Sequence, residues 1–348
     1  MAVIRATSTR LPSFTYSKAD ICAVGDRWLK DAPHELELFK RFVSSSQITQ
    51  RHFAVPLETI LSLGGPASRA QHFQEHARPL LSATISQLLS DVAIDPQTVD
   101  HLVFTSCSAP TIPAIDVGIV DDLRLRRSLS RIPVYQHGCA GGVVGLAMAH
   151  RVLRSGQTAI VSSAELCSLV YQSADLTGGN LVGSAIFGDG AAAALLQEVG
   201  PGLAIIDARS HLVPESAHLM GYNSEDNGPH LRLDRALPQA LAQHAPPFIT
   251  SFLSDNGLAP TEISWWLFHP GGVKVLAALE ETLKIERCRS RWAWDILERF
   301  GNMSSASILF VLDAFMRSST AKPNESVCMV GVGPGLTIEA ILLRQKVN

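Results

Sequence analysis

Short apolar runs alternate along this chain with longer segments in which apolar residues recur at helical spacing. The runs cover residues 102–104, 158–162, 266–268 and 327–332. They are too short for helices and almost uniformly apolar, which is typical of strands that are buried on both faces. Buried strands that alternate with helices predict an α/β fold.

The pattern also repeats itself at an offset of about 164 residues. Residues 89–91 (Leu-Ser-Asp) and Pro96 match residues 253–255 and Pro260, and the apolar run that follows each proline matches as well. At an offset of about 163, Gly138-Cys139 falls opposite Gly301-Asn302. Matches that stay in register across several elements indicate a duplicated fold. We therefore expect two halves, residues 1–205 and 206–348, with the cysteine in the first half.

Three polar residues stand where such a fold places functional sites, at strand ends and helix starts. Cys139 precedes a helical run of small residues, and the helix dipole and free backbone N–H groups there favour the thiolate. His269 follows a predicted strand, and Asn302 precedes a predicted helix. Together they suggest acyl transfer and carbon–carbon bond formation through a thioester. A buried cysteine that only packs, a turn-forming histidine and a helix-capping asparagine are the structural alternatives.

The chain resembles the type III polyketide synthases, the chalcone synthase-like branch of the thiolase fold. The resemblance rests on residues 138–142 (GCAGG), 181–191 (LVGSAIFGDGA), 269–272 (HPGG), 301–306 (GNMSSA) and 331–337 (GVGPGLT). It implies a duplicated, five-layer αβαβα architecture and a homodimer. It also implies that Cys139 accepts an acyl starter, which decarboxylative Claisen condensation with malonyl thioester then extends. The expected product is a pyrone or a phenol, and the expected substrates are acyl-CoA and malonyl-CoA, or acyl carrier protein, without a cofactor or metal.

Under this resemblance, the His269 Nε2–H and the Asn302 amide can donate to the enolate oxygen that decarboxylation creates. Further residues are assigned to substrate binding. Phe187 lines the site near the malonyl carboxylate or belongs to the core, and Ile112 reaches across the dimer. Cys107 and Cys167 line the elongation cavity, as in bacterial members, or pack in the core. The glycine-rich turns shape the site or are structural, and they comprise Gly271, Gly272, Gly333, Pro334 and Gly335.

Substrate delivery is less clear from the sequence. The family grips CoA phosphates with basic residues, and Arg41 keeps one such position, whereas Leu38 and Ser45 stand where lysines are common. Lys40 could compensate. Because these lysines are missing, delivery of the substrate by an acyl carrier protein is an alternative. The arginine-rich stretch 124–131 would then be its docking surface; otherwise it is an ordinary solvated face.

Two other functions stay open: a single condensation of carrier-bound acyl chains, and a catalytically inactive structural partner.

Composition excludes several classes. The net charge of −3 gives no reason to expect nucleic acid, and no long apolar stretch predicts a membrane span or a secretory signal. Six scattered cysteines without a CxxC pair predict a reducing cytoplasm. Residues 72–76 (HFQEH) fit a zinc-peptidase pattern, but their polar surroundings favour a chance match, so we expect no metal site. Residues 331–335 do not open a βαβ unit and are not a dinucleotide loop.

Overall fold

The computed structural model describes residues 1–108 and 111–346. Within them, the main sheet has nine strands in the order β11-β12-β13-β8-β1-β7-β6-β4-β5. Their bounds are β1 Val3–Arg10, β4 His101–Ser106, β5 Ser130–Tyr135, β6 Thr158–Leu166, β7 Asp189–Gln197, β8 Gly202–Leu212, β11 Trp265–Phe268, β12 Ser326–Gly333 and β13 Thr337–Lys346. All residues of β12 and of β6 are buried, as the apolar runs predict.

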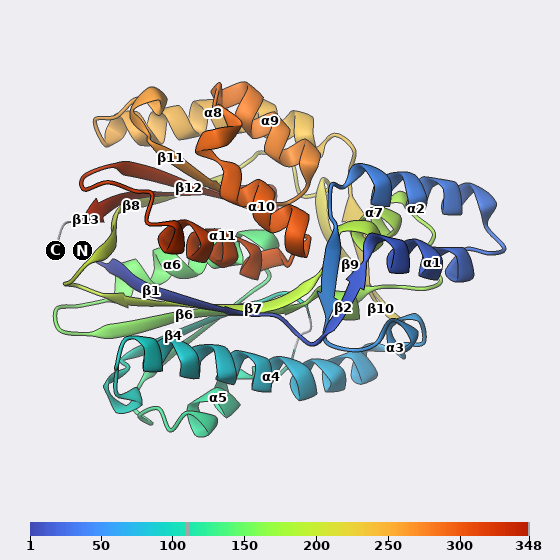
Figure 1. The fold of residues 1–348 in the computed structure, drawn as a ribbon, viewed down its shortest axis with the longest axis horizontal. Coiled ribbons are helices and arrows are strands. Elements are labelled where there is room, and N and C mark those ends of the chain that lie inside the picture. The colour runs from blue at the N-terminus through green and yellow to red at the C-terminus, as the bar shows by residue number, and fades with distance from the viewer. Residues whose placement is uncertain (109–110, 347–348) are drawn as a thin grey trace.

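The sheet folds over between β1 and β8, which share only the pairs Val3–Ala204 and Ile4–Leu203 in the described chain. Two half-sheets result, and helices α6 (Gly141–Val152) and α11 (Ser304–Ser318) lie between them (Figure 1). Helices α4 (Pro66–Asp91) and α5 (Asp116–Asp122) cover one outer face, and α8 (Leu237–Asp255) and α9 (Val273–Leu283) cover the other. These five layers confirm the predicted αβαβα architecture.

Each half uses the same order of elements. A long helix is followed by a proline-led 3₁₀ turn (η1 Pro96–Thr98 or η4 Pro260–Glu262), then a buried strand, a central helix and two more strands. The central helices approach closely because Gly142 has no side chain. A Cβ at Gly142 would lie 2.4 Å from the Ser305 carbonyl oxygen and 2.5 Å from the Ile308 side chain. This contact brings the starts of α6 and α11 together.

A smaller lobe covers one end of the central layer (Figure 1). It contains β2 Phe14–Ser17, α1 Lys18–Trp28, α2 Pro33–Ser45, β3 Gln50–Phe53, α3 Leu57–Leu61, α7 Gly178–Ile186 and the hairpin of β9 Met220–Glu225 and β10 Gly228–Leu233. Helix α10 (Arg291–Phe300) packs against α11 and contacts β3 of this lobe. Helix α1 begins with a capping box in which Ser17 and Asp20 bond each other's backbone N–H groups. Among the described helices, none has the length and apolarity that crossing a membrane requires.

Candidate active site

Cys139 lies in the 3₁₀ turn η2 (Gly138–Ala140), directly before α6. Cys139 therefore lies in the short turn before the α-helix, whereas the sequence placed it at the helix start itself. Burial raises the pKa of Cys139 to about 11, and hydrogen bonds with Ser304 and Asn302 oppose that rise, while Glu165 adds to it. This raised pKa favours the neutral thiol and opposes the effect of the helix start, which favours the thiolate.

His269 directly follows β11, and its backbone N–H donates to the Val330 carbonyl oxygen at 2.9 Å. Its side chain is 2% exposed, and neither ring nitrogen has a hydrogen-bond partner among the described residues. Burial lowers the pKa of His269 to about 3, so the imidazole is neutral at neutral pH. A neutral imidazole offers one donor and one acceptor. Two unsatisfied buried nitrogens are unusual in a protein core and indicate a functional side chain.

Asn302 joins three segments. Its backbone pairs with the Phe187 segment in a parallel β-bridge, where its N–H donates to the Ile186 carbonyl oxygen at 2.8 Å. Its Oδ1 accepts from the Ser304 N–H at 2.8 Å, and its Nδ2 donates to the Gly271 carbonyl oxygen at 3.3 Å. The side chain thus bonds the first residue of α11 and still directs its amide donor toward the histidine loop.

Two buried residues that sequence analysis missed lie beneath Cys139. Glu165 is the one charged residue of β6, is fully buried, and accepts from the Cys107 N–H at 3.0 Å and from the hydroxyls of Ser108 and Ser305. Burial raises its pKa. The Ser304 hydroxyl lies 3.1 Å from the Cys107 sulfur. The sequence signal for Glu165 was a single glutamate within a predicted buried strand, because glutamate is rarely fully buried unless it has polar partners.

Of the other residues assigned to substrate binding, Cys107 and Cys167 lie near Glu165, whereas Ile112 lies at the surface. Burial raises the pKa of Cys107 well above its usual range, and the nearby Glu165 and Cys139 add to that rise. Burial likewise raises the pKa of Cys167, and Glu165 and Cys107 add to it. Cys167 opens the turn η3 (Cys167–Val170). Ile112, in contrast, is fully exposed at the surface of this chain.

The glycine-rich loop 331–335 packs against the nucleophile's turn. A Cβ at Gly333 would lie 2.5 Å from the His137 carbonyl oxygen, and one at Gly138 would lie 2.6 Å from Pro334. Gly138 also has a left-handed φ of 49° and Gly335 one of 137°, which glycine tolerates best. In the histidine loop, Gly271 lies against the His269 ring, and Gly272 (φ 146°) precedes α9.

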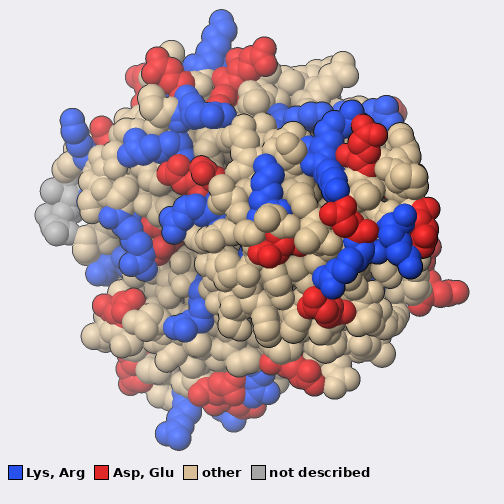
Figure 2. Space-filling model, turned by 45° about the vertical axis from the view of Figure 1, so that its right-hand side comes forward, with Lys and Arg blue, Asp and Glu red and all other residues tan. Residues whose placement is uncertain are grey.

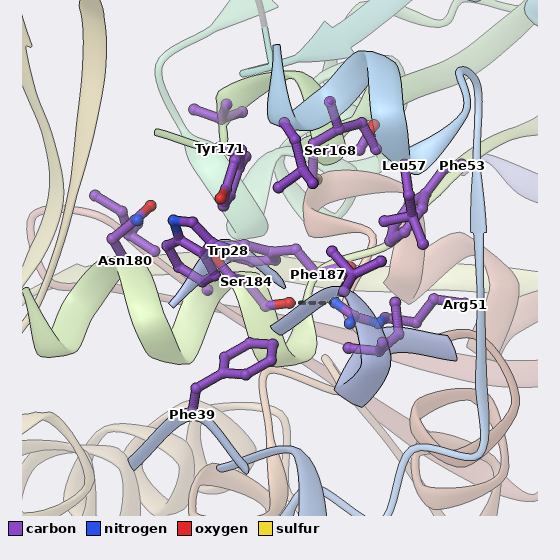
Figure 3. Close-up of a pocket in the computed structure, with 18 of the residues that line it drawn as sticks. Trp28, Phe39, Arg51, Phe53, Leu57, Ser168, Tyr171, Asn180, Ser184 and Phe187 are labelled. Carbon is purple, nitrogen blue, oxygen red and sulfur yellow. Dashed lines mark hydrogen bonds between the residues drawn. The ribbon is translucent and has the colours of Figure 1, made fainter. Parts of the chain in front are cut away.

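An apolar pocket opens beside Phe187 and Cys167 (Figure 3). It encloses about 640 Å³, its mouth included, between α1, α2, α3, α7 and the β9–β10 hairpin. Its apolar walls come mainly from Ile21, Trp28, Phe39, Leu57, Ile60 and Leu231. Arg51 at its edge is buried and donates to the carbonyl oxygens of Ser184 at 2.6 Å and Phe187 at 3.0 Å. This bonding fixes the chain segment that carries Phe187.

The basic residues singled out for delivery have different environments. Arg41 is exposed on α2 and forms no ion pair within the described residues, whereas Lys40 pairs with Asp26 of α1 at 2.5 Å. Lys40 is thus held toward α1, and its compensation for the missing lysines stays a prediction. In the stretch 124–131, the pairs are Arg126–Asp100 (2.7 Å), Arg127–Asp121 (2.5 Å) and Arg131–Asp116 (2.8 Å).

Paired arginines give this stretch no strong net positive charge, which favours the solvated-face interpretation over a docking site for an acidic carrier. On the face of the molecule shown in Figure 2, which includes the small lobe, basic and acidic side chains are likewise intermixed. Electrostatic docking relies on a continuous field of one sign. Neither surface has that property.

The fold and the Cys-His-Asn constellation define a thiolase-like acyltransferase, and comparison with known proteins supports this class. Residues 36–200 match the family model of the chalcone and stilbene synthase N-terminal domain, and residues 203–347 match that of the C-terminal domain. The chain therefore belongs to the chalcone and stilbene synthase family, and it is an acyltransferase of the type III polyketide synthase class.

Individual relatives agree with this assignment. The chain is 31% identical to a 1,3,6,8-tetrahydroxynaphthalene synthase of Streptomyces peucetius subsp. caesius over 98% of this chain and 92% of that protein. It is 31% identical to the alpha-pyrone synthesis polyketide synthase-like Pks18 of Mycobacterium tuberculosis over 98% of this chain and 91% of that protein. The crystal structure of the tetrahydroxynaphthalene synthase of Streptomyces coelicolor superposes with a TM-score of 0.95, covering 99% of this chain and 100% of that one at 25% identity.

Proposed function

We propose that Cys139 accepts an acyl starter from a CoA thioester and that the enzyme extends it by repeated decarboxylative Claisen condensation with malonyl-CoA. Cyclisation then releases a pyrone or a phenolic product. Two observations carry this proposal. The buried His269 ring has no hydrogen-bond partner among the described residues, and two hydrogen bonds orient the Asn302 amide, one of them to Gly271 of the histidine loop. The His269 N–H and the Asn302 amide are then two neutral donors that are held in place, and such donors stabilise an enolate oxygen.

Starter loading begins from the neutral thiol. Cys139 attacks the carbonyl carbon of the acyl-CoA while His269 takes the thiol proton on its free ring nitrogen. The bond between the carbonyl carbon and the CoA sulfur then breaks, and the imidazolium returns the proton to the leaving CoA thiolate. The acyl group remains on Cys139, and His269 is neutral again.

Extension uses the same donors differently. The malonyl carboxylate leaves as carbon dioxide, and its bonding electrons form an enolate whose oxygen accepts from the His269 N–H and the Asn302 Nδ2–H. Phe187 provides an apolar wall that disfavours the carboxylate relative to carbon dioxide. The enolate carbon attacks the thioester on Cys139, and the thiolate leaves. The lengthened chain, now on CoA, can return to Cys139 for another round.

The cavity for the growing chain belongs to this proposal, and we place it beside the turn that carries Cys139. We assign its walls to Cys107, Cys167, Gly333, Pro334 and Gly335, and we assign Gly271 and Gly272 to the wall beside the histidine. Cys167 lines the apolar pocket, which supports its place in this assignment. Gly333 packs against His137 and Ala140, so a side chain there would displace the turn that carries Cys139.

The starter is the finer part of the proposal. The pocket beside Phe187 has apolar walls, so it favours an aliphatic or aromatic acyl group over a charged one. Burial of each methylene group contributes about 0.8 kcal/mol. A starter with a longer apolar chain should therefore bind more tightly, up to the length that the pocket admits.

The proposal also includes the site of CoA binding, the oligomeric state and the location of the protein. We place Arg41 at the CoA phosphates, as its exposure and lack of an ion pair permit. A homodimer is supported by the full exposure of Ile112, which an interface would cover. A cytoplasmic location fits six cysteines that are all unbridged. Catalysis as written uses no metal or organic cofactor.

We also propose that the chain divides into the two halves that share one architecture. The expected boundary at residue 205 falls inside β8 (Gly202–Leu212), so a division that keeps every strand whole lies between β7 and β8. The two family models, which end at residue 200 and begin at residue 203, support this division.

The test is a product analysis. The enzyme is incubated with malonyl-CoA and a series of acyl-CoA starters of increasing chain length, and the products are identified by mass spectrometry. We expect masses that correspond to the starter plus several two-carbon units less water. Products with a single added unit would support the one-condensation alternative, and no products with any starter would support an inactive structural partner.

A further inference from the structure

Helix α4 carries three side chains of metal-ligating type near its start: His72, Glu75 and His76. Their spacing of three and four residues puts them on one face of the helix. The candidate ligand atoms of all three lie within 4.8 Å of one another. The sequence pattern by itself favoured a chance match, but this convergence gives it the geometry that a chelating site needs.

The two histidines are available as ligands. Their rings stack with centroids 6.1 Å apart, and the buried Nδ1 of His72 has no hydrogen-bond partner in the described chain, with the Glu75 carboxylate 4.0 Å away. The ring of His76 is half-buried beside that of His72. Metal ions bind the neutral form of histidine.

The carboxylate is oriented from outside the cluster. The Oε1 atom of Glu75 accepts a hydrogen bond from the Gln71 side chain at 2.8 Å. The other carboxylate oxygen, Oε2, is the one that lies 4.0 Å from His72. Contacts of this kind position the ligands of many protein metal sites.

We propose that His72, Glu75 and His76 bind one divalent transition-metal cation, with zinc as the physiological candidate and water completing the coordination. Two imidazoles and one carboxylate suit zinc, cobalt, nickel or copper, whereas magnesium and calcium prefer oxygen ligands. Ligand atoms around a tetrahedral zinc ion are roughly 3.4 Å apart. The partly exposed side chains can close the remaining gap by rotamer changes.

The position of the site indicates a structural role. Arg69, one turn before His72, is buried and donates to the backbone oxygens of Leu169 and Tyr171, the latter at 2.7 Å. These residues lie in or next to η3, which forms part of the wall of the apolar pocket. A cation that links His72 to His76 would stabilise that turn of α4. The preceding turn carries Arg69, which binds the pocket wall, so the cation would support this wall indirectly. The site is outside the layer that contains Cys139 (Figure 1).

The test uses full-length protein that has been treated with a chelator and is then titrated with zinc in a calorimeter. The cluster variant His72→Gln/His76→Gln is compared with the matched control His34→Gln/His218→Gln, which removes two exposed histidines outside the cluster. We expect wild type and control to bind one zinc ion and to melt at a higher temperature with it. The cluster variant should bind at least about 100-fold more weakly and lose the shift in melting temperature.

Free thiols also bind zinc, so cobalt serves as a second probe. Cobalt bound by histidine and carboxylate shows visible bands without the strong near-ultraviolet charge-transfer absorption that thiolate ligands produce. Circular dichroism checks that both double variants keep the native helix content. The proposal is overturned if wild type binds no zinc, if the cluster variant binds it as tightly as the control, or if thiolate absorption accounts for the bound cobalt.

Discussion

The Asn302 side chain donates a hydrogen bond to the carbonyl oxygen of Gly271, at 3.3 Å between Nδ2 and the oxygen. Asn302 and Gly271 belong to the two loops of the C-terminal half that carry the asparagine and the histidine. This bond couples the two loops and places the Asn302 amide beside the His269 ring, against which Gly271 packs. The two proposed enolate donors are thus positioned by one contact.

Loss of the Asn302 donor should affect decarboxylation more than loading. Asn302→Ala should slow malonyl-CoA decarboxylation by roughly 10²–10³-fold, as for removal of an oxyanion donor. Asn302→Asp is the sharper variant, because it keeps an oxygen for the Ser304 N–H but loses the amide donor. Both should still accept an acyl starter on Cys139. Release of carbon dioxide at the wild-type rate in either variant would remove Asn302 from its proposed role.

The neutral state of the Cys139–His269 site predicts a specific pH dependence. With the pKa of Cys139 raised to about 11, the thiolate fraction is small at pH 7 and increases about tenfold per pH unit until the pH approaches that value. Alkylation of Cys139 by iodoacetamide should therefore accelerate steadily from pH 7 to pH 10. Peptide mass spectrometry separates this reaction from that of the exposed Cys288. A rate that is already at its plateau at pH 7 would instead show a thiolate–imidazolium pair.

The apolar pocket should set the length of starter that the enzyme accepts. Leu61→Trp introduces a large ring at the pocket wall, and we expect kcat/KM for long-chain acyl-CoA to fall by about tenfold or more while short starters are unaffected. Leu63→Trp is the control, since Leu63 is also partly buried in this segment but does not line the pocket. Equal losses for short and long starters would show general damage to the fold rather than loss of a chain-binding site.

Arg41 should contribute to capture of CoA. Arg41→Ala should raise KM for acyl-CoA several-fold with little change in kcat, and the effect should shrink at high salt, because an exposed phosphate contact is screened. Arg127→Ala removes an exposed arginine that pairs with Asp121 and should leave KM unchanged. A further comparison uses the same acyl group on CoA and on an acyl carrier protein. Better use of the carrier-bound substrate would favour the alternative mode of delivery.

The sequence predicted much of the fold because its signals are local. The apolar runs 102–104 and 266–268 lie in the buried strands β4 and β11, and the proline-led turns before them recur in both halves. The positions of His269 and Asn302 after a strand and before a helix follow from the same pattern. These features depend on periodicity and turn chemistry, which a single segment contains.

What the sequence did not predict depends on contacts between distant segments. Glu165 gains its surroundings from residues more than fifty positions away on either side, and the apolar pocket combines α1–α3 with α7 and a later hairpin. The pairing of Lys40 with Asp26 is likewise visible only once α1 and α2 pack together. The burial that raises the pKa of Cys139 is likewise a product of the tertiary fold, which the local sequence around the cysteine does not contain.

The most direct test of the account is the mass of the intact protein after incubation with an acyl-CoA starter. Wild type should gain one acyl group, located on Cys139 by peptide mapping, and Cys139→Ala should gain none while keeping its melting temperature. Addition of malonyl-CoA should then discharge the acyl group from wild type. Stoichiometric acylation of Cys139→Ala, or an acyl group on wild type that malonyl-CoA cannot remove, would contradict Cys139 as the nucleophile of chain extension.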